Sequence, residues 1–374
     1  MKVLLSSNTS WYLYNFRAST IRRLVGDGHQ VICLSPPDSH SARLESELGA
    51  RHVALPLEGK STSILKELRS FGFIWRVVRQ DRPDMVFNFT VKMNIYCGLV
   101  SALQRIPFAN NISGLGTAFI HDSWLFRFVR LLYGWVNRRA RHLFFQNEED
   151  LAVFQDQGML GDTAYTLLPG SGIDLEHFSL VPLPNGSPVT FIMIGRLLGD
   201  KGVREYAQAC QLLKEQGVPV RCLLLGPLGA SNRTAIAEEE VAHWQDEGIL
   251  EYLGSVDDVR PMIAQSHVLV LPSYREGTPK ILLEAASCGL PIVATDIAGC
   301  QGVVVEGVNG FLVPVKDSVV LAERIGRLCG DAEMRREMGM KGREIILQGF
   351  SSEIVVRETL RVYEELLGED VGAT

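Results

Sequence analysis

Two glutamates stand eight positions apart in the stretch REGTPKILLEAASCGLPIVATD, residues 275–296. The stretch follows the strand-like run VLVLPS (268–273). Glu276 is followed directly by Gly-Thr-Pro, and Glu284 falls inside an apolar helical pattern. A carboxylate can accept hydrogen bonds from a vicinal diol such as ribose presents, and the free N–H groups at a helix start attract phosphate oxygens. The spacing therefore favours one carboxylate for each of two sugars, with a diphosphate between them. Two unrelated glutamates near a helix are the alternative interpretation.

The helix expected in this stretch carries its own start and stop signals. Thr278 can cap it, Pro279 suits its first position, and Gly289 can end it. The free N–H groups then fall within residues 278–281, where Pro279 itself has none. Because helical side chains lean toward the N-terminus, the carboxylate of Glu284 is expected to point back toward this end of the helix while staying clear of the phosphates.

A second charged loop is IGRLLGDKG, residues 194–202, which follows the strand-like run VTFIMI. Gly195 and Gly199 free the backbone, and Arg196 and Lys201 supply two cations five positions apart. The loop is neither a Walker A motif nor a GxGxxG fingerprint. Two cations after a strand suit a diphosphate, with arginine as a fork and lysine as a point charge. Two solvated surface cations are the alternative.

The elements that must hold these loops follow a regular order. The chain alternates β-branched runs with helical patterns, which is typical of α/β folds with parallel sheets. The segment VPLPNGSP (181–188) interrupts the series like a linker, and the series then restarts. We therefore expect two similar domains, residues 1–184 and 185–350, and a C-terminal helix in 351–374 that packs back toward the first domain. Ligands of such sheets bind beyond the carboxyl ends of the strands.

The composition is that of a globular protein, with 46% hydrophobic and 21% charged residues in 374. No apolar run predicts a transmembrane helix, and the N-terminus lacks the pattern of a signal peptide. Seven cysteines without a CxxC pair favour reduced thiols in a cytosolic protein. Residues 1–184 hold 19 Lys/Arg and 16 Asp/Glu, and the remainder hold 18 and 27. The N-terminal half is thus the one expected to meet an anionic surface.

Together these stretches resemble the nucleotide-sugar half of glycosyltransferase family 4. The Glu-x7-Glu motif of that family is present as Glu276-GTPKILL-Glu284, and its diphosphate loop as GRLLGDKG. The tail GVNGFLVPVKDSVVLAERIGRL extends the resemblance over about residues 165–350. The N-terminal segments YNFR and NISGLGTAF resemble bacterial transferases that act on undecaprenyl-diphosphate-linked sugars and build O-antigen, capsule or N-glycan precursors.

The resemblance implies the GT-B architecture, in which two Rossmann-like domains with parallel sheets face a cleft. It implies retaining transfer of a hexose or N-acetylhexosamine from a nucleotide sugar, most often UDP-linked, to a polyprenyl-diphosphate-linked saccharide. Arg196 and Lys201 would bind the donor diphosphate. Glu284 would bind ribose, and Glu276 with Gly277–Lys280 would hold the donor sugar and phosphates. No essential metal is implied, and the absence of an Asp-x-Asp motif agrees with leaving-group stabilisation by cationic side chains.

The acceptor side departs from the family pattern. Many members carry an Ala-His-Gly or similar histidine in the N-terminal cleft, whereas this chain has Ser113 and Gly114 there. His121, a few residues later, is the substitute candidate. Members of the subgroup often have arginine after the loop cysteine, where this chain has Gln301. These departures concern acceptor activation and leave the donor motifs intact.

Residues 122–145 combine arginines with aromatic side chains. On a helix this combination suits anionic lipid headgroups, and Arg138, Arg139 and Arg141 are candidates for the acceptor side. A buried domain helix with an arginine-lined solvent face is the alternative. A pI of 5.8 and the absence of a stacking motif argue against a nucleic-acid partner. We expect a cytoplasmic protein, peripheral on the inner face of the plasma membrane.

Three other functions share some of these features. A nucleotide-sugar 2-epimerase of the same fold would need no acceptor. A non-catalytic nucleotide-sugar-binding subunit would bind the donor without turnover, although the intact cations and carboxylates argue against it. A two-carboxylate glycosidase would hydrolyse glycosides without any nucleotide.

Overall fold

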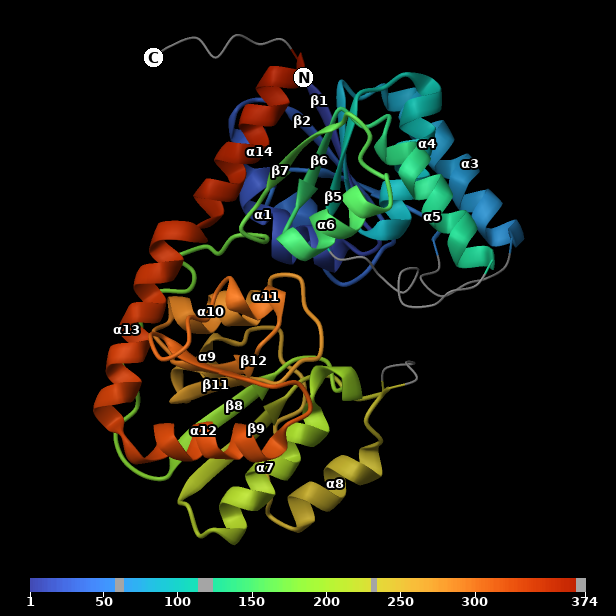
Figure 1. Ribbon diagram of the computed structural model, residues 1–374. Helices are drawn as coiled ribbons and strands as arrows, with labels where there is room; N and C mark the ends of the chain where they lie inside the picture. The colour runs from blue at the N-terminus through green and yellow to red at the C-terminus, as the bar shows by residue number, and fades with distance from the viewer. Residues whose placement is uncertain (58–63, 114–123, 230–233, 368–374) are drawn as a thin grey trace. The chain divides into compact units, whose positions relative to one another are not determined.

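The computed structural model describes residues 1–57, 64–113, 124–229 and 234–367 (Figure 1). The chain divides into two compact units, the first combining Met1–Ser171 with Ser352–Thr374 and the second comprising Gly172–Ser351. The second unit therefore begins at Gly172, earlier in the chain than the boundary expected at residue 184. The reason is that Ile173 and Phe178 are buried in the core of the second unit.

A seven-stranded parallel sheet forms the centre of the first unit, in the order β3-β2-β1-β4-β5-β6-β7. Its strands are β1 (Lys2–Ser6), β2 (Gln30–Ser35), β3 (Arg51–Ala54), β4 (Met85–Phe89), β5 (Phe108–Ile112), β6 (His142–Phe145) and β7 (Ala164–Leu167). The helices are α1 (Ser10–Gly26), α2 (Ser41–Ser46), α3 (Ile64–Asp81), α4 (Val91–Gln104), α5 (Trp124–Asn137), α6 (Glu148–Asp156) and α14 (Ser352–Leu367). Residues of α1, α2 and α14 pack on one face of the sheet, and residues of α3 to α6 pack on the other (Figure 1).

The second unit repeats this plan with a six-stranded parallel sheet, in the order β10-β9-β8-β11-β12-β13. Its strands are β8 (Val189–Ile194), β9 (Val220–Leu225), β10 (Glu251–Tyr252), β11 (Val268–Leu271), β12 (Ile292–Thr295) and β13 (Gly310–Val313). Its helices are η2 (Gly199–Lys201), α7 (Val203–Glu215), α8 (Glu238–Asp246), α9 (Arg260–Ala264), α10 (Lys280–Ser287), α11 (Ala298–Gln301), α12 (Ser318–Gly330) and α13 (Ala332–Gly349). The predicted α/β class with two parallel sheets is confirmed.

Both sheets have a topological switch point at the same place. The first strand of each pairs with the second strand on one side and with the fourth on the other, so β1 lies between β2 and β4, and β8 between β9 and β11. The connections leave in opposite directions at this point, and the loops beyond the strand ends open a crevice. Ligands of doubly wound sheets bind there.

Local sequence signals account for several helix ends. The hydroxyl of Thr9 accepts a hydrogen bond from Tyr12 N at 3.1 Å, and Asn147 caps α6 through Asp150 N at 2.7 Å. Gly28, with φ of 82°, follows the end of α1 because glycine adopts the left-handed backbone at little cost.

Candidate functional site

Two loops meet at the switch point of the second sheet. One follows β8 and carries Lys201, and the other follows the neighbouring strand β11 and carries Glu276. Lys201 Nζ donates to Glu276 Oε1 at 2.5 Å, and the two side chains remain 18% and 15% exposed. A partly exposed ion pair at the carboxyl edge of a parallel sheet lies where a ligand can reach both partners.

A hydrogen bond from a buried serine orients the carboxylate of Glu276. Ser273 Oγ donates to Glu276 Oε1 at 2.7 Å, and Ser273 O accepts a hydrogen bond from Thr295 Oγ1 of β12. The sequence interpretation did not select Ser273. The available signal was a serine just after the predicted strand VLVL, at the edge where ligands bind.

Tyr274 ties the same loop to the first one. Its hydroxyl donates to Glu205 Oε1 at 2.6 Å, and its backbone N–H donates to Asp200 O at 2.9 Å. Burial, reinforced by Glu205, raises the pKa of Tyr274 to about 12. The phenol therefore remains a protonated donor at neutral pH and holds the loop that carries Glu276 against α7.

Glycines allow the loops to approach this closely. A Cβ on Gly202, which has φ of 76°, would lie 2.0 Å from Pro272 O. A Cβ on Gly299 would lie 1.8 Å from Gly277 O. Since real Cβ atoms do not approach oxygen so closely, any side chain at either position would displace the loop that carries Glu276.

Arg196 belongs to the same loop after β8 as Lys201, but its side chain is not engaged in the same way. Its side chain is exposed, and within the described residues its guanidinium has no hydrogen-bond or ion-pair partner. A Cβ on the preceding Gly195 would meet nothing within 4 Å, so packing within the chain does not require glycine there. The site thus combines a lysine bound to a carboxylate with an arginine that is open to an anion.

Helix α10 starts later than predicted. It begins at Lys280, and Pro279 occupies the cap position with an extended ψ of 117° and no side-chain capping bond. The prediction that Thr278 caps the helix and Pro279 is its first residue is therefore wrong. The predicted stop is confirmed, because Gly289 adopts φ of 84° just beyond the last turn.

Glu284 is the buried carboxylate of the site. It lies within α10 and is 8% exposed, with its Oε1 3.4 Å from Lys280 Nζ. Burial raises the pKa of Glu284, and the nearby ammonium of Lys280 opposes the shift. A desolvated carboxylate of this kind is a strong hydrogen-bond acceptor for a diol that reaches it.

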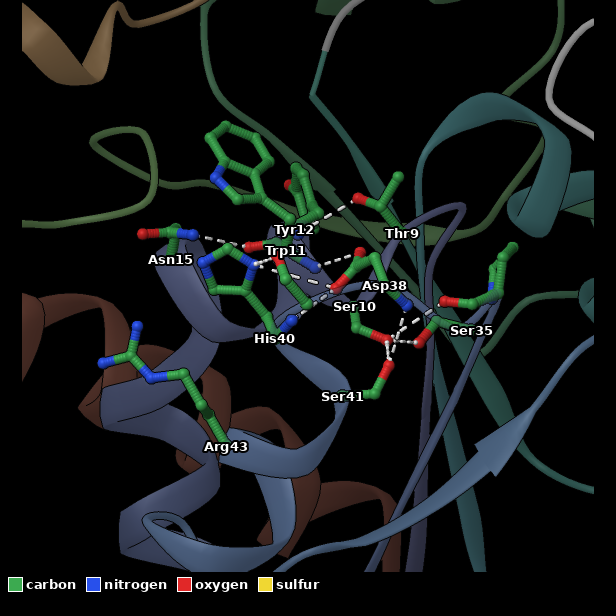
Figure 2. A network of polar contacts seen from close by, with 12 residues as sticks. Thr9, Ser10, Trp11, Tyr12, Asn15, Ser35, Asp38, His40, Ser41 and Arg43 are labelled. Carbon is green, nitrogen blue, oxygen red and sulfur yellow. Dashed lines mark hydrogen bonds and ion pairs between the residues drawn. The ribbon is translucent and has the colours of Figure 1, made fainter. Parts of the chain in front are cut away.

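The carboxyl edge of the first sheet carries a polar network around the start of α1 (Figure 2). Ser10 Oγ lies 2.8 Å from both Ser35 Oγ and Ser41 Oγ, and Trp11 N donates to Asp38 Oδ2 at 2.8 Å. The network joins the loops after β1 and β2. Its members bond one another, so it positions the start of α1 at the ligand-binding edge. The sequence signal was the run of serine and threonine directly after the first strand.

Comparison of the sequence with protein-family models identifies the family of this chain. The description "Glycosyl transferase 4-like domain" matches residues 16–169, and "Glycosyl transferases group 1" matches residues 188–331. Each match falls within one unit, and together they span most of the chain. This chain is a family 4 glycosyltransferase.

Individual relatives resemble this glycosyltransferase along its length. The N,N'-diacetylbacillosaminyl-diphospho-undecaprenol alpha-1,3-N-acetylgalactosaminyltransferase of Campylobacter jejuni is 24% identical over 98% of this chain and 99% of its own. The UDP-Gal:alpha-D-GlcNAc-diphosphoundecaprenol alpha-1,3-galactosyltransferase of Escherichia coli is 23% identical over 80% of each chain. The predicted family and enzyme class are confirmed.

Solved structures agree on the fold. Anabaena HepE in complex with UDP and glucose superposes with a TM-score of 0.80 at 17% identity, over 97% of this chain and 99% of that one. Sucrose-phosphate synthase from Thermosynechococcus elongatus gives 0.79 at 19% identity, over 98% and 99%. The predicted GT-B class is confirmed.

The acceptor candidates of the glycosyltransferase are only partly placed. Ser113 directly follows β5, at the carboxyl edge of the first sheet, and is half-buried. Gly114 and His121 lie outside the described residues. The acceptor role of these three positions stays a prediction.

The three arginines expected on a helix lie elsewhere. Helix α5 ends at Asn137, so Arg138, Arg139 and Arg141 belong to the connection that enters β6 at its amino end. That end lies at the sheet edge opposite to the one where ligands bind. The structure therefore does not place these arginines with an acceptor site at the carboxyl edge.

Two of these side chains are engaged within the first unit. Arg138 Nη1 donates to Gly158 O at 3.1 Å. Arg139 Nη1 donates to Trp135 O at 3.1 Å, and its guanidinium carbon lies 3.6 Å from the centroid of the Trp135 ring. Both contacts stabilise the turn between α5 and β6.

Two further findings concern the part of the glycosyltransferase that the structure describes. No group of three or more His, Cys, Asp or Glu side chains is arranged to hold a metal ion in that part. None of its helices has the length and apolar character needed to cross a membrane. Independence from metal stays a prediction.

Proposed function

We propose that this glycosyltransferase moves a hexose or N-acetylhexosamine from a UDP-linked donor to a polyprenyl-diphosphate-linked saccharide during assembly of a cell-surface polysaccharide. The observation that carries the donor half is the Lys201–Glu276 contact at the switch point of the second sheet. The acceptor half is supported by the names of the C. jejuni and E. coli relatives, both of which specify diphospho-undecaprenol-linked sugars.

The cations act on the leaving group. In the transfer, the bond between the anomeric carbon and a β-phosphate oxygen breaks, and the acceptor hydroxyl oxygen bonds to that carbon while its proton is released. Negative charge then accumulates on UDP. Arg196 can meet the diphosphate without giving up another partner, whereas Lys201 must share its ammonium with Glu276. Fixed cations of this kind stabilise the developing charge in the transition state.

The two carboxylates divide the sugars between them. Glu276 stands at the mouth of the site and is partly exposed, which suits hydroxyls of the transferred sugar. Glu284 is buried within α10, which suits the ribose diol of the nucleotide. The backbone of Gly277, Thr278 and Pro279 connects the two positions, and the N–H groups of Gly277 and Thr278 can donate to the phosphates.

Retention and metal independence complete the proposal. Retaining transfer from an alpha-linked UDP-sugar gives an alpha product, and both relatives are named for an alpha-1,3 linkage. Arg196 and Lys201 together supply the positive charge that a metal would otherwise bring to the diphosphate. The polyprenyl chain of the acceptor lies in a bilayer, so we place the enzyme as a peripheral protein at the inner face of the plasma membrane.

The test is a panel of UDP- and GDP-sugars incubated with polyprenyl-diphosphate-linked acceptors, scored for free nucleotide and for elongated lipid. We expect acceptor-dependent release of UDP with matching lipid product. Interconversion of the nucleotide sugar without release of nucleotide would identify a 2-epimerase instead. Donor binding without turnover would identify a non-catalytic subunit, and hydrolysis of glycosides without nucleotide a glycosidase.

A further inference from the structure

The outer side of α5 exposes two large apolar side chains. Phe128 is 58% exposed and Leu131 is 72% exposed. They are three positions apart, so they lie on the same side of the helix. The inner side of α5 is buried through Tyr133 and Val136, which pack into the core. The exposed pair is therefore not needed to fix the helix on the sheet.

A second helix on the same face of the sheet carries another exposed apolar side chain. Helices α3 and α5 both contact α4 on the same face of the first sheet (Figure 1). Leu68 of α3 is 61% exposed. We name Leu68, Phe128 and Leu131 the apolar set of the α3–α5 face. Exposed large apolar side chains on one layer of helices are disfavoured by solvation, and a partner can cover them.

The α3–α5 face carries more basic than acidic residues. Residues 124–141 contain no Asp or Glu, and α3 has only two acidic residues. Both of the latter are paired, Glu67 with Lys92 at 2.7 Å and Asp81 with Arg51 at 2.6 Å. The basic residues are Lys66, Arg69, Arg76 and Arg79 on α3, and Arg127 and Arg130 on α5. A basic, partly apolar face on a chain of net charge −6 suits an anionic partner that also accepts apolar side chains.

We propose that the α3–α5 face docks on an anionic lipid leaflet, with Phe128 and Leu131 at the acyl boundary and the basic side chains at the headgroups. This combination of an apolar strip flanked by Lys and Arg is how interfacial helices bind lipid. The inference rests on the proposed function, because a membrane-anchored acceptor brings the enzyme to such a leaflet. It replaces the assignment of lipid contact to Arg138, Arg139 and Arg141.

Sedimentation with vesicles tests the docking face without reference to activity. The full chain is mixed with vesicles of phosphatidylcholine containing phosphatidylglycerol, and with phosphatidylcholine alone. We expect binding to the anionic vesicles that weakens as salt rises. The double variant Phe128→Ser and Leu131→Ser should partition about a hundredfold more weakly, about tenfold for each lost apolar side chain.

A matched control keeps the comparison specific. Val319 and Leu347 of the second unit are 66% and 49% exposed, and the double variant Val319→Ser and Leu347→Ser should bind like the wild type. Unchanged thermal unfolding of both double variants shows that the fold is retained. Equal binding of the Phe128/Leu131 variant and the wild type would overturn the proposal, as would a wild type that binds neither kind of vesicle.

Turnover separates this proposal from the proposed reaction. With a short-chain, water-soluble polyprenyl-diphosphate saccharide, the Phe128/Leu131 variant should be as active as the wild type. With the full-length acceptor in vesicles, it should lose activity in proportion to its lost binding. A wild type that is inactive with both acceptors but binds anionic vesicles would overturn the reaction and leave the docking face standing.

Discussion

Lys201 and Glu276 are separated by 75 positions in the chain, yet Lys201 Nζ lies 2.5 Å from Glu276 Oε1. They meet because β8 and β11, the strands that precede their loops, are neighbours in the sheet. The contact joins the cation assigned to the diphosphate to the carboxylate assigned to the transferred sugar. A change to either side chain therefore alters the surroundings of the other.

Removal of either cation should slow the reaction. Arg196→Ala and Lys201→Ala are each expected to lower turnover by about 10²–10³, the effect of losing one group that stabilises transition-state charge. Steady-state UDP release measures this. Arg221→Ala is the control, since Arg221 forms an exposed pair with Glu251 at 2.6 Å and should leave turnover unchanged. Normal turnover in both site variants would remove the diphosphate assignment.

A double-mutant cycle tests whether the contact matters for turnover. Glu276→Ala should lower turnover by itself, and the variant lacking both Lys201 and Glu276 should be less impaired than the product of the single effects. Groups in direct contact couple by about 0.5–3 kcal/mol. The matched cycle pairs Glu276 with Arg196, to which it is not bonded. Multiplicative effects in the Lys201 cycle would show that the pair does not act as a unit.

The buried carboxylate of Glu284 should lower the free energy of unfolding at neutral pH. Burial raises its pKa, so the folded state holds the proton more tightly than the unfolded state does. Its contribution to the free energy of unfolding therefore falls as pH rises from the unfolded pKa to the folded pKa. Glu284→Gln is expected to raise Tm at pH 7, with a difference that shrinks toward pH 4, as thermal unfolding across pH can show.

The same variant should bind UDP more weakly while turnover at saturating donor changes little, because a ribose contact is present in ground and transition states alike. Calorimetric titration measures the binding. The control for the Tm prediction is Glu251→Gln. Arg221 lowers the pKa of Glu251, so removing this carboxylate should not raise Tm. A lower Tm for Glu284→Gln at pH 7 would contradict the prediction.

A methyl group at Gly299 should displace the loop that carries Glu276. In Gly299→Ala the new Cβ would meet Gly277 O at 1.8 Å, so the loop with Glu276 must shift. We expect a loss of about 1–3 kcal/mol in stability and a larger loss in turnover than in folded fraction. Gly302→Ala is the control, because a Cβ there meets nothing within 4 Å. Similar behaviour of the two variants would show that the close approach is unimportant.

Metal removal should leave the reaction intact. If Arg196 and Lys201 neutralise the diphosphate, treatment with EDTA followed by desalting is expected to preserve UDP release. A loss of activity that manganese or magnesium restores would instead show that a metal ion performs this role.

The positions of the chemistry-bearing loops can be predicted from the order of residues along the chain. The runs VTFIMI and VLVLPS predicted the strands that precede Arg196 and Glu276, and the structure has β8 and β11 there. Alternation of apolar side chains, glycine stops and family motifs are local properties, so the order of residues along the chain reveals them. The GT-B class followed from the same motifs.

Local patterns were weaker at helix ends. The aromatic and basic pattern of residues 122–145 suits a helix, although α5 ends at Asn137 and β6 begins at His142. An apolar run fits a helix or a strand equally until its neighbours are known. Thr278 was expected to cap α10, but Pro279 keeps an extended ψ and the first turn starts one residue later.

Which of these groups are in contact depends on how the strands and helices pack. The ion pair of Lys201 with Glu276, the support from Ser273 and the tie between Tyr274 and Glu205 all depend on strand order. The exposure of Phe128 and Leu131 likewise depends on which side of α5 the sheet covers. These relationships join residues far apart in the chain. The pattern along one strand or helix states which side is apolar, but not which neighbour will cover it.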